Sequence, residues 1–458
     1  MDVEDGEEAV RRGWLRWLGV GTGGLALVLV ALWTQRTPIA ENFVSRELNR
    51  RGVQANYDLT QVGLRTQRIE NIVLGDPARP DLTARWVEID IAFAGVTPQV
   101  AAVRAGGVRM HASLHDGIVR LGELDKFRDP DSTAPFSLPD ILLALSDARL
   151  RFDTDAGQIG MRIDGTGNLR SGFAGKLAAV MPRAALAGCG LTGGTALLDI
   201  TMGDGRPHIA GPIRADALAC RDRATSIARP LAKLDVRLGK ALDEWSGVVD
   251  LSGQALKSNG LVLAAPSGRI DFDGNARTTR GRARIGASAL SIAGALARQA
   301  EVTGTWRVNA SDMALQGQLT AQDVHGANRD PLAGAMASAA GTPVGPLVAR
   351  LGDGVRSAGQ DNKLRTHFAL AQKGAAGSIV LTDSQFTARS GARAGVAPDG
   401  RVTLAWPGRG GAAIDWALDG ALTTEGGGLP KAALRLTRRA GGGYGGQLFV
   451  DPYAAGAA

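Results

Sequence analysis

The feature that most constrains this chain is an apolar run near its start, from Trp17 to Thr34, which contains no ionisable side chain. Roughly 18 or more such residues are long enough to cross a bilayer as a helix. Trp14 and Trp17 lie at one end of the run and Trp33 at the other, where an indole ring can rest at the membrane surface. The run predicts one transmembrane helix over residues 14–34, with these three tryptophans as interface anchors.

A cleaved secretory signal peptide is the competing interpretation of this run. It needs a shorter apolar core and a cleavage site of small residues, which Leu32-Trp33-Thr34-Gln35 does not offer. We therefore expect an uncleaved anchor, with residues 1–13 in the cytoplasm and the body outside it. Arginines flank both ends, so this orientation depends on the body, whose composition is unlike that of a cytosolic enzyme.

The body is rich in glycine and poor in large side chains, with 63 glycines in 458 residues and 5% aromatics. Few bulky residues are available to fill a thick core, whereas glycine favours turns and closely packed backbones. Apolar and polar residues alternate with a period of two in many segments, which is typical of strands. The sequence predicts a mainly β fold, in which a single N-terminal transmembrane helix precedes an elongated, groove-like antiparallel β body with a helical hairpin insertion.

Helix and turn signals divide the body. Thr37-Pro38 opens an amphipathic helix over residues 37–52, and the pairs Asp330-Pro331 and Thr342-Pro343 open two short helices, the second of which is expected to end at Gly352. Asp-Gly pairs between strand-like runs predict hairpin turns. The predicted parts are a first β body over 53–328, a helical hairpin over 329–356, a second and incomplete β body over 357–453, and a tail over 454–458.

The chain has two cysteines, Cys189 and Cys220. In an oxidising compartment an isolated pair can form a disulfide, and two free buried thiols are the alternative. We expect the disulfide, because the body is expected outside the cytoplasm.

Motifs for catalysis and for metal binding are missing from the sequence. His111 and His115 lack the glutamate of a zinc-protease motif and lie in a strand-like segment, so we interpret them as a surface pair. Asp164, Asp199 and Asp250 are expected at strand ends, where turn formation explains them. We expect no catalytic residue, no cofactor and no metal site. Basic residues are scattered among acidic ones, which argues against a nucleic-acid partner.

The apolar faces of the strands are the remaining candidate site. One face of this kind can line a groove for acyl chains, which need apolar contact and few hydrogen bonds. The same faces can instead pack against each other in a closed sandwich, and periodicity does not separate the two. The candidate groove residues are Val87, Ile89, Ile91, Phe93, Leu150, Phe152, Val302, Trp306 and Val308.

Seven local segments are distinctive in combination: Arg51-Gly52-Val53, Arg65-Thr66-Gln67-Arg68-Ile69, Leu74-Gly75-Asp76-Pro77, Pro80-Asp81-Leu82-Thr83-Ala84, Gly122-Glu123-Leu124-Asp125-Lys126, Pro135-Phe136-Ser137-Leu138-Pro139-Asp140 and Gly341-Thr342-Pro343-Val344-Gly345-Pro346. Together they resemble the YdbH family of AsmA-like proteins, in an alphaproteobacterial version. The resemblance implies an inner-membrane anchor, a long hydrophobic β groove in the periplasm, and transport of phospholipid between the inner and outer membranes. Members of that family are longer, so a truncated member is expected.

The expected function is therefore phospholipid transfer without chemistry, with membrane phospholipids as the main partner and an outer-membrane or periplasmic protein as a further one. Two other functions stay open. The same surface suits an envelope scaffold or assembly factor that binds proteins, and a periplasmic hydrolase is the third hypothesis.

Overall fold

The computed structural model of the 458-residue chain describes residues 48, 50–63, 65–94, 97–116, 118–127, 138–186, 188–220, 224–258, 260–292, 294–309, 312–326, 332–374, 376–406, 415–438 and 444–453. The predicted transmembrane segment, its tryptophans Trp14, Trp17 and Trp33, and most of the predicted 37–52 helix lie outside these residues. Within the described ranges, no helix is long and apolar enough to cross a membrane.

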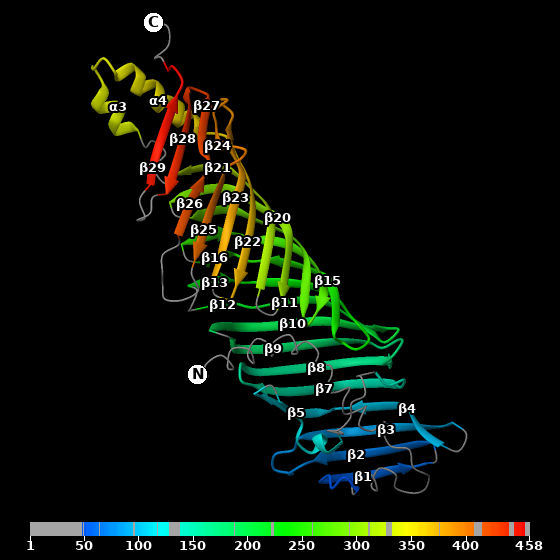
Figure 1. Cartoon of the computed structure of the whole chain (residues 1–458). Helices are drawn as coiled ribbons and strands as arrows, with labels where there is room; N and C mark the ends of the chain where they lie inside the picture. Colours follow the sequence, from blue (N-terminus) through cyan, green and yellow to red (C-terminus); the bar gives the residue numbers. More distant parts are fainter. Residues whose placement is uncertain are drawn as a thin grey trace, which may run out of the picture. The chain divides into compact units, whose positions relative to one another are not determined.

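The chain forms two compact units. Of the residues that the structure describes, unit 1 contains those within 48–220, 228–250 and 273–276, and unit 2 contains those within 224–227, 251–272 and 277–453. Each unit is mainly β (Figure 1), which confirms the predicted fold class at this level. The domain boundaries predicted from the sequence are not tested by this grouping and stay a prediction.

Unit 1 is a run of neighbouring strands. Most of its pairings are antiparallel, as a succession of hairpins predicts. The elements are β1 Ala55–Val62, β2 Thr66–Leu74, β3 Leu82–Ala94, β4 Thr97–Gly106, β5 Arg109–His115, β6 Ile118–Arg120, the 3-10 helix η1 Gly122–Phe127, β7 Leu142–Thr154, β8 Gly157–Asn168, β9 Ala174–Leu186, β10 Cys189–Gly203, β11 Arg206–Arg214, β12 Ala217–Cys220, β14 Leu231–Leu238 and β15 Glu244–Ser252.

Strand β7 departs from the predicted antiparallel order. It pairs in parallel first with β4, through Ala102–Gly106, and then with β5, through Arg109–Leu114. Parallel neighbours need a connection of a dozen residues or more, because the chain must return to the same end of the sheet. The segment between β5 and β7, which includes β6 and η1, makes that return.

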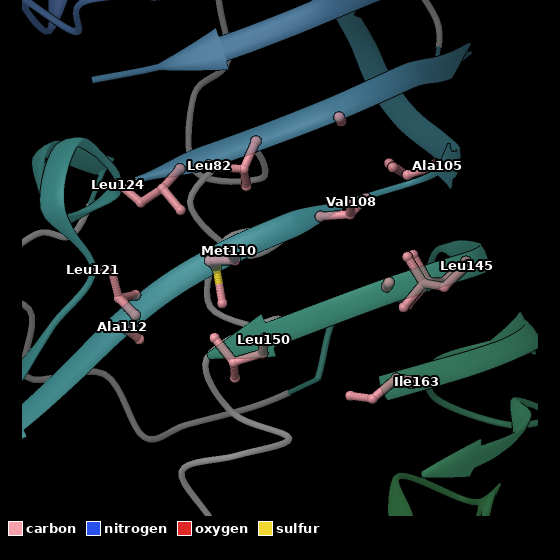
Figure 2. Close-up of a cluster of buried hydrophobic side chains, with 14 of the residues drawn as sticks. Leu82, Ala105, Val108, Met110, Ala112, Leu121, Leu124, Leu145, Leu150 and Ile163 are labelled. Atoms are coloured by element: carbon pink, nitrogen blue, oxygen red, sulfur yellow. The ribbon is translucent and has the colours of Figure 1, made fainter. Parts of the chain in front are cut away.

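One large apolar cluster lies in unit 1. Figure 2 shows Leu82, Met110 and Leu150 on three neighbouring strands, with Leu124 of η1 and the preceding residue Leu121 at one end of the group. The register agrees with this view, because Met110 is the partner of Leu82 on one side and of Leu150 on the other. Burial of this many aliphatic side chains is the main source of stability for unit 1.

Unit 2 also consists of antiparallel neighbours, with two α-helices after β21 (Figure 1). Its elements are β13 Thr225–Ala228, β16 Ala255–Ser258, β17 Leu261–Ala264, β18 Ser267–Asn275, β19 Thr278–Ile292, β20 Ala295–Asn309, β21 Asp312–Gly326, α3 Ala333–Ala339, α4 Gly345–Ala358, β22 Asn362–Lys373, β23 Ala376–Ala388, β24 Arg393–Val396, β25 Arg401–Trp406, β26 Asp415–Asp419, β27 Ala421–Gly426, β28 Leu429–Arg438 and β29 Tyr444–Val450.

Helix α4 does not end at Gly352, contrary to expectation. A Cβ atom on Gly352 would collide with the Met336 side chain of α3, and one on Gly354 would lie 2.7 Å from the Gly428 carbonyl oxygen. These glycines allow close packing inside the helix, and they are not C-caps. Small residues are therefore needed where α4 packs against α3 and against the turn between β27 and β28.

Two Asp-Gly pairs that predicted turns lie inside strands. Asp164-Gly165 belongs to β8 and Asp273-Gly274 to β18. A Cβ atom on Gly165 would lie 2.5 Å from the Phe173 ring, so this glycine makes room for an aromatic side chain on the sheet. Asp204-Gly205 forms the expected turn, with positive φ at both residues.

Candidate functional site

The candidate residues on β3 differ in burial along the strand. Ile89 is buried, Val87 and Ile91 are half-buried, and Phe93 is 39% exposed. Val87 packs against the large apolar cluster of unit 1. This face of β3 is therefore packed in the interior at Val87 and Ile89 and is accessible to solvent near the end of the strand, at Phe93.

The candidates on β7, Leu150 and Phe152, belong to the buried cluster itself. Leu150 is the register partner of Met161 on β8, which is in turn the partner of Ala179 on β9. Each of these strands contributes a side chain to one apolar row that crosses the sheet. In unit 1 such rows are packed among other side chains.

Unit 2 has a comparable row of apolar side chains, which are less buried than those of unit 1. Trp306 is the partner of Leu315, and each following member is the partner of the next, across five neighbouring strands. All five side chains are half-buried. We call this row the unit 2 apolar stripe; it consists of Trp306 on β20, Leu315 on β21, Leu370 on β22, Ile379 on β23 and Leu404 on β25.

A second row lies beside the stripe. Phe368, Leu381 and Val402 are half-buried register partners, and Leu418 on β26 is buried at the end of the row. In the described part of unit 2, the buried hydrophobic cluster is small and consists of Ala297, Ala300 and Ala321. The rows of unit 2 thus have apolar side chains that no large cluster covers.

Of the remaining candidates on β20, Val302 is half-buried and Val308 is 39% exposed. The indole N–H of Trp306 is buried and has no hydrogen-bond partner among the described residues. Trp306 is the register partner of Gly281 on β19. An apolar stripe with one unused donor is suited to a long apolar ligand that offers few acceptors.

Charged side chains form ladders across the strands of unit 1. The side chain of Arg109 donates to Asp147, which also pairs with Arg149. The hydrogen bond from Arg109 is the largest cause that holds the pKa of Asp147 below its ordinary value. These carboxylates are kept ionised by basic neighbours, which is the opposite of what a general acid needs.

Asp164, Asp199 and Asp250 do not lie at strand ends, contrary to expectation. They lie inside β8, β10 and β15. Asp164 accepts from Arg162, the largest cause of its lowered pKa, and Asp199 accepts from Lys176 on the neighbouring strand. Pairing with a basic residue accounts for both aspartates, on the same strand for Asp164 and across to β9 for Asp199, and turn formation does not.

His111 and His115 each contact an aspartate in the same region. The Nε2 atom of His111 lies 2.6 Å from the carboxylate of Asp153, and the Nδ1 atom of His115 lies 2.6 Å from that of Asp155. The two histidines thus have separate partners. Among the residues described here, no group of three or more metal-ligating side chains is found.

Cys189 and Cys220 are register partners on β10 and β12, and the structure joins them in a disulfide. The pairing in the native protein stays a prediction. Sequence reasoning found single strand faces but missed the rows, because the register between strands decides which faces align. The signal available in the sequence was the repeated apolar residue at every second position of successive strands.

No curated protein and no solved structure matches the chain. A family model described as "YdbH-like: Intermembrane phospholipid transport protein YdbH" matches residues 25–449, which is most of the chain and confirms the resemblance seen in the sequence. The chain therefore belongs to the YdbH-like family of intermembrane phospholipid transport proteins.

Proposed function

We propose that this chain is an inner-membrane-anchored periplasmic protein that carries phospholipid between the inner and outer membranes along the apolar rows of its strands. Membership of the YdbH-like family supports intermembrane phospholipid transport. The anchor is supported by the uncharged run from Trp17 to Thr34, and its orientation by the composition of the body, which is unlike that of a cytosolic enzyme.

The observation that carries the proposal is the unit 2 apolar stripe. Its five side chains are aligned by register and half-buried, so they can exchange contact with water for contact with an acyl chain. Four strand spacings of about 4.8 Å give it a length of about 19 Å. An extended fatty acyl chain can follow such a row without needing hydrogen bonds.

The stripe can be tested by photo-crosslinking in living cells. A photoreactive amino acid at Leu370 should capture phospholipid, because this side chain lies in the stripe. The same amino acid at Ala369 is the matched control, since the neighbouring residue of a strand points to the opposite face. Equal lipid capture at both positions would remove the support from the stripe.

The two other hypotheses predict different products in this experiment. A scaffold or assembly factor predicts that Leu370 captures a protein and no lipid. A periplasmic hydrolase predicts that the captured lipid is converted by the purified chain, for example to lysophospholipid or free fatty acid. Transport predicts intact phospholipid.

A further inference from the structure

A cavity of about 650 Å³ opens in unit 1 at one edge of the sheet. Strands β8 to β11 follow one another as antiparallel neighbours (Figure 1), so the turns β8–β9 and β10–β11 lie on the same edge. The loop after β14 reaches this edge as well, because β14 pairs with β11. The cavity is lined by residues that include Leu138, Arg170, Ser171, Asp204, Arg206 and Lys240.

Backbone contacts hold these turns together. The N–H of Gly205 donates to the carbonyl oxygen of Arg170 over 2.5 Å, which ties the β10–β11 turn to the β8–β9 turn. The N–H of Arg170 in turn donates to the side chain of Asn168. Asp204 and Gly205 both have positive φ, as a tight hairpin turn requires. The cavity is therefore formed by fixed turns before any ligand arrives.

Most of the polar side chains around the cavity make no hydrogen bond or ion pair within the described part of the chain. Within the described part of the chain, Arg206, Lys240 and the Ser171 hydroxyl have no hydrogen-bond or ion-pair partner, and neither does the carboxylate of Asp204. Arg170 differs from them, because it lies 3.6 Å from Asp140. Two free cations, a hydroxyl and one free carboxylate thus surround the same space.

An apolar side chain lines the cavity next to these charges. Leu138 is buried and belongs to the large apolar cluster of unit 1, together with Phe173 and Met202. The N–H of Met202 donates to the carbonyl oxygen of Phe173, so both are fixed beside the turns. The cavity therefore has a polar lining of both signs and an apolar wall.

We propose that this cavity binds the zwitterionic headgroup of a phospholipid that carries both a phosphate and an amine, as phosphoethanolamine does. The phosphate lies between Arg206 and Lys240 and accepts a hydrogen bond from Ser171, since charge-assisted hydrogen bonds are the strong ones. The ammonium pairs with Asp204, and the glycerol end faces Leu138. The lipid source of the headgroup depends on the proposed function, whereas the recognition of phosphate and amine does not.

Binding should be measured with the full-length chain in detergent, using soluble glycerophosphoethanolamine, inorganic phosphate and whole phosphatidylethanolamine as separate probes. The double variant Arg206→Gln/Lys240→Gln should lose about tenfold or more in affinity for all three, because two charge-assisted contacts disappear. The matched control is Arg214→Gln/Lys233→Gln, which removes two cations from the opposite ends of the same strands, β11 and β14. The control should bind like the unmodified chain.

Asp204→Asn separates the amine from the phosphate. Asparagine tolerates positive φ, so the turn should survive. We expect weaker binding of glycerophosphoethanolamine and unchanged or tighter binding of inorganic phosphate. An equal effect on both probes would overturn the assignment of the amine to Asp204.

The remaining outcomes separate this inference from the proposed function. Loss of affinity in the control pair as large as in the cavity pair overturns the site, because any surface charge would then serve. Phospholipid capture at Leu370 without binding of the soluble headgroup overturns the site and leaves the transport proposal intact. Binding of the soluble headgroup without any phospholipid overturns the lipid source and supports a site for free phosphoamines.

Discussion

Ile89 on β3 lies directly opposite Gln67 on β2, and both side chains are buried. An ionised group at this buried position would have no charged partner in the register pair. We therefore expect Ile89→Asp to destabilise unit 1 by about 3 kcal/mol or more. Chemical denaturation followed by circular dichroism measures this change.

Phe93→Asp is the control for that substitution. Phe93 lies on the same strand but is 39% exposed, so the new carboxylate stays in water and the fold should survive. A folded Ile89→Asp variant that binds lipid normally would falsify the assignment of Ile89 to a packed interior. An unfolded Phe93→Asp variant would show that the Phe93 side chain, near the end of β3, is covered in solution.

The apolar faces of single strands could be predicted from the sequence, but the positions where these faces switch could not. In β7, Leu143 and Leu145 are buried before the switch, and Ala148, Leu150 and Phe152 after it. A register shift and a positive φ at Asp147 move the apolar face by one position. Asp147 is held there by Arg109 of another strand, a contact that no local pattern reveals.

The candidate site depends on contacts of the same long-range kind. Trp306 was predicted from its own strand, whereas Leu315, Leu370, Ile379 and Leu404 join it only through the register of four further strands. Registers depend on bulges and turns along the whole sheet. A single sequence therefore predicts which residues are apolar on a face, and the structure is needed to show which faces form a row.

Asn362 fixes helix α4 to the sheet of unit 2. Its buried amide accepts from the N–H of Val324 and donates to the carbonyl oxygens of Val324 and Ala358. Asn362→Ala leaves these buried backbone groups without partners and should lower the free energy of unfolding by about 2 to 4 kcal/mol. Lys363→Ala, one residue along and exposed, should change it by less than about 0.5 kcal/mol. Equal effects of the two substitutions in denaturant titrations would contradict this role.

Asp153 should make stability depend on pH in acid. Hydrogen bonds from Gln158, followed by those from His111 and Arg151, lower the pKa of Asp153 to about 2. Because this pKa lies below the unfolded value, the ionised carboxylate contributes stability that is fully present above about pH 4 and is lost as the pH falls toward 2.

Thermal melts at a series of pH values test this dependence. Asp153→Asn should show a smaller loss of stability between about pH 4 and 2 than the unmodified chain, since the titrating group is gone. Gln158→Leu should act in the same direction, because it removes the strongest hydrogen bond to the carboxylate. Identical pH profiles for all three chains would show that other groups dominate acid unfolding.

Cys189 and Cys220 should be bonded to each other in the native protein. They face each other on β10 and β12, and closing a loop of about 30 residues stabilises a chain by roughly 3 to 4 kcal/mol in the chain-entropy estimate. Peptide mapping without reductant should yield one cross-linked peptide pair, and reduction should lower the unfolding midpoint. The double variant Cys189→Ala/Cys220→Ala should not respond to reductant. Two free thiols in the native protein would disprove the bond.

The membrane topology of the chain can be tested with reporter fusions. We expect residues 1–13 in the cytoplasm, an uncleaved anchor over 14–34 and the body in the periplasm, because the uncharged run is flanked by Trp14, Trp17 and Trp33 and lacks a cleavage site. A fusion made after Gly52 to a reporter that works only in the periplasm should be active, and the matching cytoplasmic reporter should be silent. Immunoblotting should detect the fusion at its uncleaved mass in the inner-membrane fraction. A product shortened by the length of the anchor would support the signal-peptide interpretation, and an active cytoplasmic reporter would reject both the periplasmic body and the oxidising environment that the cysteine pair needs.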